Sequence, residues 1–325
     1  MTYLAILTAL ITSIAVAAPA AAAEDYPNRA ITWVVPFGAG GVTDNTARIV
    51  AKAMSKITGQ PVLVDNRPGA GGIVGTEYVA SSKPDGYTIL YASSGPMAVN
   101  PTLYKGKLTY DPLKSFTPVQ ALSQANMLIV VNPDAPFKTL PELIEFAKKN
   151  PGKLNFGSPG QGTAQHLSAE LLQAEAGIKM THVPYKTGAT QMTDLMSGVL
   201  DLSIEYPAVV RPYIEAGKMR AIAMTGAKRF KGFPDVPSIA ELGYSNAQNA
   251  GWSTIAVPAG TPPDIVKKLA SVVWEALKDP SVVQYYDAND NMPLGDLGSD
   301  KTRDFIAKET EKFRTVVERS GATAE

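Results

Sequence analysis

The stretch ITWVVPFGAGGVTDNTARIVAKAM (31–54) decides the fold, because it reads as a strand, a glycine-rich bend and a helix. The apolar run 31–37 is typical of a buried strand, and Ala47, Val50 and Met54 recur at helical spacing. A loop of this kind leaves backbone N–H groups free at a helix N-terminus, where an anion is favoured. This loop lacks the lysine of a nucleotide-binding loop. It therefore indicates an anion that is held without that side chain.

The second half of the chain repeats this plan. A strand is predicted over KLNFGS (153–158), a glycine turn over PGQG, and a helix over TAQHLSAELLQAEAG (163–177). At an offset of 120 residues Gly40 matches Gly160 and Thr43 matches Thr163. The identities are too few to establish a sequence repeat. The shared plan predicts two similar α/β lobes that face each other.

Further strands and helices extend both halves. Strand–helix–strand alternation is typical of a mostly parallel sheet that helices cover on both faces. The pattern suggests that the chain crosses from lobe one to lobe two near residue 124 and returns near residue 250, which gives a double-crossover hinge with a cleft beneath it. Lobe one is then expected to comprise 24–124 and 251–325, and lobe two 125–250. The additional strands are predicted at 61–66, 87–93, 126–136, 180–185, 200–204, 220–226 and 251–263.

Composition narrows the class of protein. Among 325 residues the formal net charge is zero, which argues against nucleic acid as the main partner and offers no polybasic patch for a membrane. The chain has no cysteine, which excludes disulfides, thiolate nucleophiles and Cys-type zinc sites. It has only two histidines, His166 and His182. No metal or cofactor is expected.

The first 23 residues read as a secretory signal. The apolar run 3–17 is followed by small residues, with cleavage expected after Ala23, although no Lys or Arg precedes the run. The alternative is a membrane anchor, but the run is shorter than the ~20 residues that a span needs. We therefore expect an exported protein in a bacterial periplasm.

Four loops with glycine or serine are expected at the carboxyl ends of strands, where open α/β sheets bind ligands. They are FGAGGVTD (37–44), in which Thr43 or Asp44 would cap the helix, ASSGP (92–96), GSPGQGT (157–163) and PYKTGAT (184–190). Their N–H groups and hydroxyls predict a site for one or two carboxylates. The alternative is that each glycine only lets a strand turn into a helix.

Enzyme motifs are weak. The chain has no G-x-S-x-G, Walker A or H-E-x-x-H sequence. A hydrolase or isomerase would have to use Asp44, His166 and Glu205, yet Asp44 more simply caps its helix and a helical histidine more often packs. His182, within a predicted strand, is also expected to be structural. Lys186 either pairs with a ligand carboxylate or is solvated.

Glu205 and Tyr206 follow the predicted strand 200–204, where another loop enters the cleft. A carboxylate at this place is awkward for a dianionic ligand unless water or an amino group intervenes. Glu205 is therefore a candidate specificity residue.

Several segments, in this order, make the chain resemble the substrate-binding proteins of tripartite tricarboxylate transporters, also called the Bug family. They include YPNRAITWVVPFGAGGVTD, GQPVLVDNRPGAGG, KPDGYTILYASSG, NPGKLNFGSPGQGTAQHLSAELL, HVPYKTGA, FPDVPSIAELG and PAGTPPDIV. The resemblance covers the whole mature chain. It implies a two-lobed periplasmic binding protein of the type II topology, without a chemical step, that closes over a small carboxylate. Family members bind citrate-like tricarboxylates, dicarboxylates, acidic amino acids or aromatic acids.

The resemblance also implies which residues contact the ligand, through backbone groups, hydroxyls and bridging waters. The matching positions are Phe37, Gly40, Gly41, Asp44, Ser93, Ser94, Ser158, Gly160, Thr163 and Tyr185. At 204–206 this chain has IEY where the family often has an aromatic residue followed by Asp and Asn. Tyr206 and Trp252 would favour an aromatic or longer acid, unless both pack in the hinge.

The partner that the resemblance implies is a membrane transporter with one large and one small subunit, and the binding protein itself is expected to be a monomer. An alternative within binding proteins is a sensor whose closed form contacts a signalling receptor.

Overall fold

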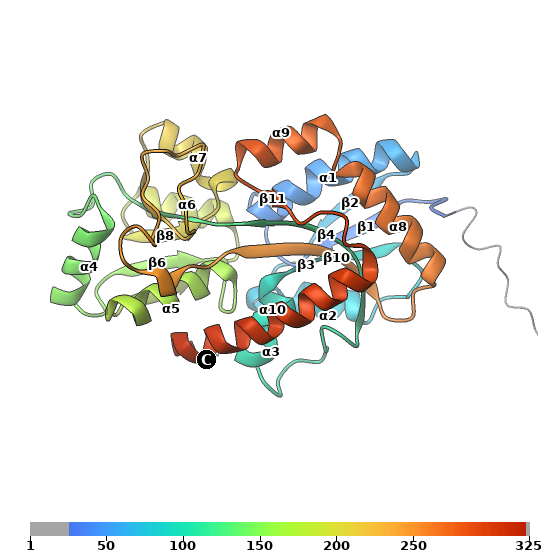
Figure 1. Ribbon diagram of the computed structural model, residues 1–325, viewed down its shortest axis with the longest axis horizontal. Coiled ribbons are helices and arrows are strands. Elements are labelled where there is room, and N and C mark those ends of the chain that lie inside the picture. Colours follow the sequence, from blue (N-terminus) through green and yellow to red (C-terminus); the bar gives the residue numbers. More distant parts are fainter. Residues whose placement is uncertain (1–25, 323–325) are drawn as a thin grey trace, which may run out of the picture.

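The computed structural model describes residues 26–322 and contains two β-sheets, each flanked by helices (Figure 1). The expected signal peptide lies outside the described residues. The first sheet has the strand order β11-β4-β10-β3-β1-β2. Strand β1 pairs in parallel with both β2 and β3, whereas β10 runs antiparallel between β3 and β4. The strands are β1 (Ile31–Val35), β2 (Val62–Asn66), β3 (Thr88–Ser93), β4 (Phe116–Ala125), β10 (Gly251–Pro258) and β11 (Met292–Pro293).

The second sheet has the order β7-β6-β8-β5-β9. Strand β6 pairs in parallel with β7 and β8, and β5 runs antiparallel between β8 and β9. Its strands are β5 (Leu128–Val131), β6 (Asn155–Ser158), β7 (Thr181–Pro184), β8 (Leu202–Glu205) and β9 (Arg220–Met224).

The two sheets share one topology. In each sheet the first three strands, counted from β2 or from β7, are parallel to one another. The fourth strand is antiparallel to them, and the chain enters it directly from the other sheet. The fifth strand is again parallel to the first three. These entering strands are β10 and β5. The prediction of two similar, mostly parallel lobes is thus confirmed, with β10, β11 and β5 as the strands of opposite direction.

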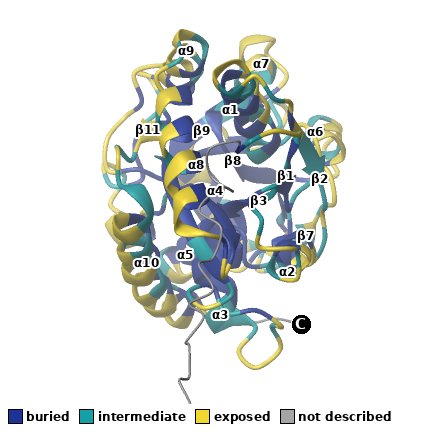
Figure 2. Cartoon of the chain, turned by 90° about the vertical axis from the view of Figure 1, so that its right-hand side faces the viewer, coloured by how far each residue is buried: buried dark blue, intermediate teal, exposed yellow. Residues whose placement is uncertain are grey.

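Helices cover both faces of the first sheet because its strands are apolar on both sides. On one face Trp33 and Val35 pack with Val50 of α1 and Leu269 of α8, and on the other Val34 and Leu90 pack with helices α2 and α10. Figure 2 shows these buried strands between helices whose outer sides are exposed. The helices are α1 (Val42–Thr58), α2 (Ile73–Ala80), α3 (Asn100–Leu103), α8 (Pro263–Ala276), α9 (Pro280–Ala288) and α10 (Gly298–Ser320), with short turns η2 (Ala70–Gly72) and η3 (Gly95–Val99).

The second sheet is covered in the same way. Leu143 of α4 and Leu171 of α5 pack on one face, and Leu195 of α6 and Val210 of α7 pack on the other. The elements are α4 (Leu140–Lys149), α5 (Ala164–Ala176), α6 (Gly188–Met196), α7 (Pro207–Glu215) and the turn η4 (Ser245–Ala247). No helix within residues 26–322 is long and apolar enough to cross a membrane.

Two chain segments connect the lobes side by side. Strand β4 leads into β5, and the chain returns from β9 to β10, where Gly251 pairs with Ala125. The C-terminal helix α10 crosses the lower middle of the molecule in Figure 1, from the first lobe toward α5. It contacts α5 as well as β4, and Arg319 at its end donates a hydrogen bond to the carbonyl of Asn246 at 3.0 Å. The carboxyl ends of β1 and β3 therefore face those of β6, β7 and β8 across this connection.

Candidate functional site

A cavity of about 450 Å³ lies between the two lobes and is lined by both. Its walls come from the loops after β1, β2 and β3 in one lobe and after β6, β7 and β8 in the other. Nine of the twelve residues expected at the site line it: Phe37, Gly41, Ser93, Ser94, Gly160, Thr163, Tyr185, Glu205 and Tyr206. The volume lies within the range of ordinary small-molecule sites.

Gly40 and Asp44 are not among the lining residues, and the structure shows what they do instead. The Gly40 N–H donates a hydrogen bond to Asp44 Oδ2 at 3.0 Å, and Asp44 Oδ1 lies 2.9 Å from Arg48 Nε. Burial alone would raise the pKa of Asp44, but the hydrogen bonds from Arg48 and Gly40 outweigh it and hold the pKa below its usual value. The ionised Asp44 carboxylate therefore fixes the conformation of the first loop, residues 37–44.

The expectation that Thr43 or Asp44 caps this helix is wrong. Helix α1 begins after Gly41 with no side-chain cap, because the Asp44 carboxylate is directed to the Gly40 N–H and to Arg48. Gly41, Val42 and Thr43 line the cavity. The uncapped first turn of α1 thus presents unsatisfied N–H groups at the positive end of a 17-residue helix.

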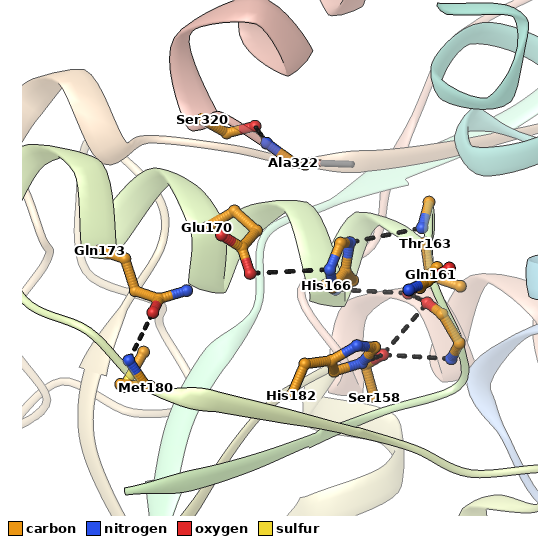
Figure 3. A network of polar contacts seen from close by, with 12 residues as sticks. Ser158, Gln161, Thr163, His166, Glu170, Gln173, Met180, His182, Ser320 and Ala322 are labelled. Carbon is orange, nitrogen blue, oxygen red and sulfur yellow. Dashed lines mark hydrogen bonds and ion pairs between the residues drawn. The ribbon is translucent and has the colours of Figure 1, made fainter. Parts of the chain in front are cut away.

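Ser158 also lies outside the lining and supports the second loop (Figure 3). Its hydroxyl accepts a hydrogen bond from the Gly160 N–H at 3.1 Å and lies 2.7 Å from His182 Nε2. Thr163 caps α5, since its Oγ1 accepts from the His166 N–H at 3.3 Å, and it donates to the Gly160 carbonyl at 2.8 Å. The second loop is fixed by neutral groups.

The two histidine rings lie behind this loop, 4.4 Å apart between centroids, and neither lines the cavity. His166 Nδ1 accepts from the Gly162 N–H at 3.4 Å. Burial lowers the pKa of His182 to about 4, and burial together with the nearby His182 lowers the pKa of His166 to about 3. Both rings are neutral near pH 7 and pack, as the sequence indicates. Of the three residues that an enzyme would need, only Glu205 reaches the cavity.

Glu205 ends β8 at the cavity wall and is only 3% exposed. Its Oε1 accepts hydrogen bonds from the Tyr206 N–H at 2.8 Å and from Gln165 Nε2 at 3.2 Å. Burial raises the pKa of Glu205 to about 7 despite these two hydrogen bonds. Lys186 also lines the cavity, from the exposed loop after β7.

Tyr206 and Trp252 are both buried and both line the cavity. The Trp252 ring packs edge-on against Phe305 of α10, with centroids 5.2 Å apart. The two alternatives for these residues, contact with a ligand and packing at the hinge, are therefore compatible, because one position can line the cavity and pack against α10. Ser93 adds a buried hydroxyl that has no hydrogen-bond partner among the described residues, which leaves it free for a ligand.

Loops of the two lobes touch each other at the wall of the cavity. A Cβ atom on Gly71 would collide with the Gln161 carbonyl oxygen, and one on Gly95 would lie 2.9 Å from the Gly162 oxygen. Tyr104 donates its hydroxyl to Gln161 Oε1 at 3.3 Å. The lobes are therefore closed in this structure, and glycine at these positions allows the close approach.

Sequence reasoning missed several lining residues. Gly71 and Gln161 lie in segments that the sequence marks as glycine turns, and Gln165 lies in the first turn of α5, so their position after strands was a usable signal. Tyr91 and Ser253 lie within strands β3 and β10 and carried no such signal. Among residues 26–322 no three His, Asp or Glu side chains gather in a metal-binding arrangement.

Known proteins are similar to this chain in sequence and in architecture. A model of the family described as "Tripartite tricarboxylate transporter family receptor" matches residues 46–322. Protein BugT of Bordetella pertussis is 37% identical over 320 residues, which are 98% of this chain and 97% of BugT. The periplasmic binding protein BugD has a TM-score of 0.88 and 33% identity, over 92% of this chain and 100% of BugD. The R. palustris protein Rpa4515, solved with adipate, has a TM-score of 0.86 and 34% identity, over 92% of this chain and 99% of that protein.

Proposed function

The chain belongs to the tripartite tricarboxylate transporter receptor family, and from this premise we propose that it captures a small carboxylate between its lobes in the periplasm and delivers it to a tripartite transporter. The observation that carries the proposal is the uncapped N-terminus of α1 at a cavity that both lobes enclose. Adipate, with which the similar protein Rpa4515 was solved, is a dicarboxylate of a size that such a cavity accepts.

The N-termini of α1, α5, α6 and α7 all reach the cavity, through Gly41, Thr163, Gly188 and Tyr206. Their backbone dipoles favour an anion without a fixed cation, and such a ligand can be released again to a transporter. We propose that the first turn of α1 and the free Ser93 hydroxyl bind the carboxylate, and that the other predicted residues on the wall enclose it.

We further propose that the lobes divide at 124–125 and 250–251, as the sequence suggests. In support, the chain changes sheet between Ala125 and Leu128 and again between Met224 and Gly251. Ligand binding would then shift the population from an open to a closed arrangement by rotation about these two connections.

A thermal-shift screen tests the binding proposal. Adipate, succinate, citrate, glutamate and terephthalate are added to ligand-free protein, and at least one should raise the melting temperature in a concentration-dependent way. Mass spectrometry should then recover that compound unchanged. A screen in which no carboxylate stabilises the protein, or in which the compound is converted, would contradict the proposal.

Delivery to a transporter is tested in cells. Removing the gene should abolish uptake of the stabilising carboxylate, and restoring it should return uptake. Uptake that persists without the gene, together with binding by the purified protein, would favour the sensor alternative.

A further inference from the structure

Glu205 is the only acidic side chain among the residues that line the cavity, and Lys186 is the only basic one in that set. The Glu205 carboxyl is at the end of β8, between β6 and β5 in the second sheet, and is almost completely buried. An acidic group at this depth is costly unless a cation or several donors compensate it. The groups that surround Glu205 therefore determine what it requires of a ligand.

The protein supplies only neutral partners to this carboxyl. The N–H of Tyr206, the residue before α7, donates to Oε1, and the Gln165 amide of α5 donates to the same atom. Glu205 Oε2 makes no hydrogen bond to any residue that the structure describes. No cationic side chain contributes to the shift of the Glu205 pKa, whose causes are burial and these two hydrogen bonds. One oxygen of a buried acid is thus left for the contents of the cavity.

The rest of the cavity has the opposite polarity. The uncapped first turn of α1 presents free N–H groups and a positive helix end, and the capped start of α5 adds a second positive helix end. A ligand that satisfies both parts needs a carboxylate at one pole and a hydrogen-bond donor, best a cation, at the other. A second carboxylate beside Glu205 would instead place two acids together, and one of them would have to take up a proton.

From this arrangement we infer that Glu205 makes the cavity selective for aminocarboxylates, with the ligand ammonium on Glu205 Oε2, over acids that lack the amino group. The inference rests on the proposed function, since it assigns the second pole of the same site. Glu205 is thereby a specificity residue that contacts the ligand directly.

Calorimetric titration of ligand-free full-length protein with matched pairs tests this inference. The pairs differ only by an amino group: succinate and aspartate, adipate and 2-aminoadipate, and 3-phenylpropionate and phenylalanine. In every pair that binds, the amino member should bind at least about tenfold more tightly, as for other buried charge pairs. Three pairs are used because they sample a short, a longer and an aromatic body.

The variant Glu205→Gln identifies the cause of any preference. It keeps the shape and an oxygen that can accept from Tyr206 and Gln165, but it removes the charge. The preference for the amino member should disappear, and affinity for the plain diacid should rise because the new amide can donate to a carboxylate. Glu145→Gln, the same change on the exposed face of α4, is the matched control and should leave all affinities unchanged.

The outcomes separate the inference from the proposed function. Equal or tighter binding of succinate, adipate or 3-phenylpropionate, or a preference that survives in Glu205→Gln, overturns the inference and leaves carboxylate capture intact. Absence of binding by every compound overturns both. A melting curve of Glu205→Gln like that of the unaltered protein shows that the variant is folded. If the variant melts at a lower temperature, the comparison of the ligand pairs in the unaltered protein decides alone.

Discussion

The loops 37–44 and 157–163 have the same place in their lobes but are supported by different chemistry. In the first, an ionised Asp44 joins the Gly40 N–H to Arg48 and leaves the start of α1 uncapped. In the second, the neutral Ser158 and Thr163 satisfy the loop and cap α5. A shared strand–glycine–helix pattern thus produces one loop with free N–H groups and one whose groups are largely occupied.

This difference assigns different tasks to the two loops. The first has the donors that a carboxylate needs, while the second offers a fixed surface against which the loop around Gly71 closes. Three experiments probe this division, and a fourth tests Glu205 on the cavity wall.

The largest effect is expected from Gly71→Ala. Gly71 has φ +60°, and its added Cβ would collide with the Gln161 carbonyl oxygen of the opposite lobe, so the closed arrangement would be blocked. Carboxylate affinity measured by calorimetry should fall by at least about 100-fold, since only a small fraction of molecules could close. Gly152→Ala is the matched control, because Gly152 has φ +75° and open space around its Cβ position. Equal losses in both variants would show that backbone strain, and not closure, is responsible.

A smaller loss of carboxylate affinity is expected from Asp44→Ala, which removes the carboxylate that joins Gly40 to Arg48 in the first loop. Loss of a charge-assisted hydrogen bond should misplace the N–H groups and weaken carboxylate binding about tenfold. Its counterpart in the second loop, Ser158→Ala, leaves His182 without its partner and should lower the melting temperature with much less effect on affinity. If Ser158→Ala weakens binding more than Asp44→Ala does, the roles of the loops are reversed.

The pH dependence of binding gives a further test. The polar neighbours of Glu205 are Gln165 of α5 and Tyr206, which precedes α7, and burial raises the pKa of Glu205 to about 7. An ammonium ligand needs ionised Glu205, so aspartate affinity should fall severalfold as the pH is lowered from 8 to 6. A diacid needs the protonated form, so adipate affinity should rise over the same range. Parallel pH profiles for the two ligands in calorimetric titrations would exclude Glu205 as the cause.

The smallest effect concerns acid sensitivity. His166 and His182 have folded-state pKa values below the ordinary value of 6.5, so an unfolded or open loop takes up protons first as the pH falls. Their contribution to stability is complete above about pH 6.5 and is lost progressively toward pH 4. Asp44, whose pKa is lowered, keeps its contribution until the pH falls below its ordinary value of 3.8. Hydrogen exchange, corrected for intrinsic rates, should therefore increase in 157–163 and not in 37–44 between pH 7 and pH 5.

Much of the architecture was predictable from local pattern. Apolar runs followed by glycine loops identified β1 and β6, and the strand–glycine–helix plan shared by both halves of the chain indicated paired lobes. Because parallel strands place their carboxyl ends at one edge of a sheet, it was also predictable that most of the loop residues would meet at one cavity.

Features that depend on distant partners were not predictable. Strand β4 contains Pro118 and Gln120 and shows no clear apolar run, yet Gln120 is fully buried. Its amide donates to the Gly295 carbonyl at 2.9 Å and accepts from the Gly298 N–H at 2.8 Å, about 175 residues away in the chain. The contact between Gly71 and Gln161 and the diversion of Asp44 from capping likewise arise only when the loops are folded together.

Small-angle X-ray scattering with and without a saturating carboxylate tests the central claim most directly, namely that the loops of opposite lobes close on one ligand. The radius of gyration of the unaltered protein should decrease when the ligand is added, and Gly71→Ala should show no decrease at the same concentration. Binding that leaves the radius of gyration of the unaltered protein unchanged would contradict closure of the lobes.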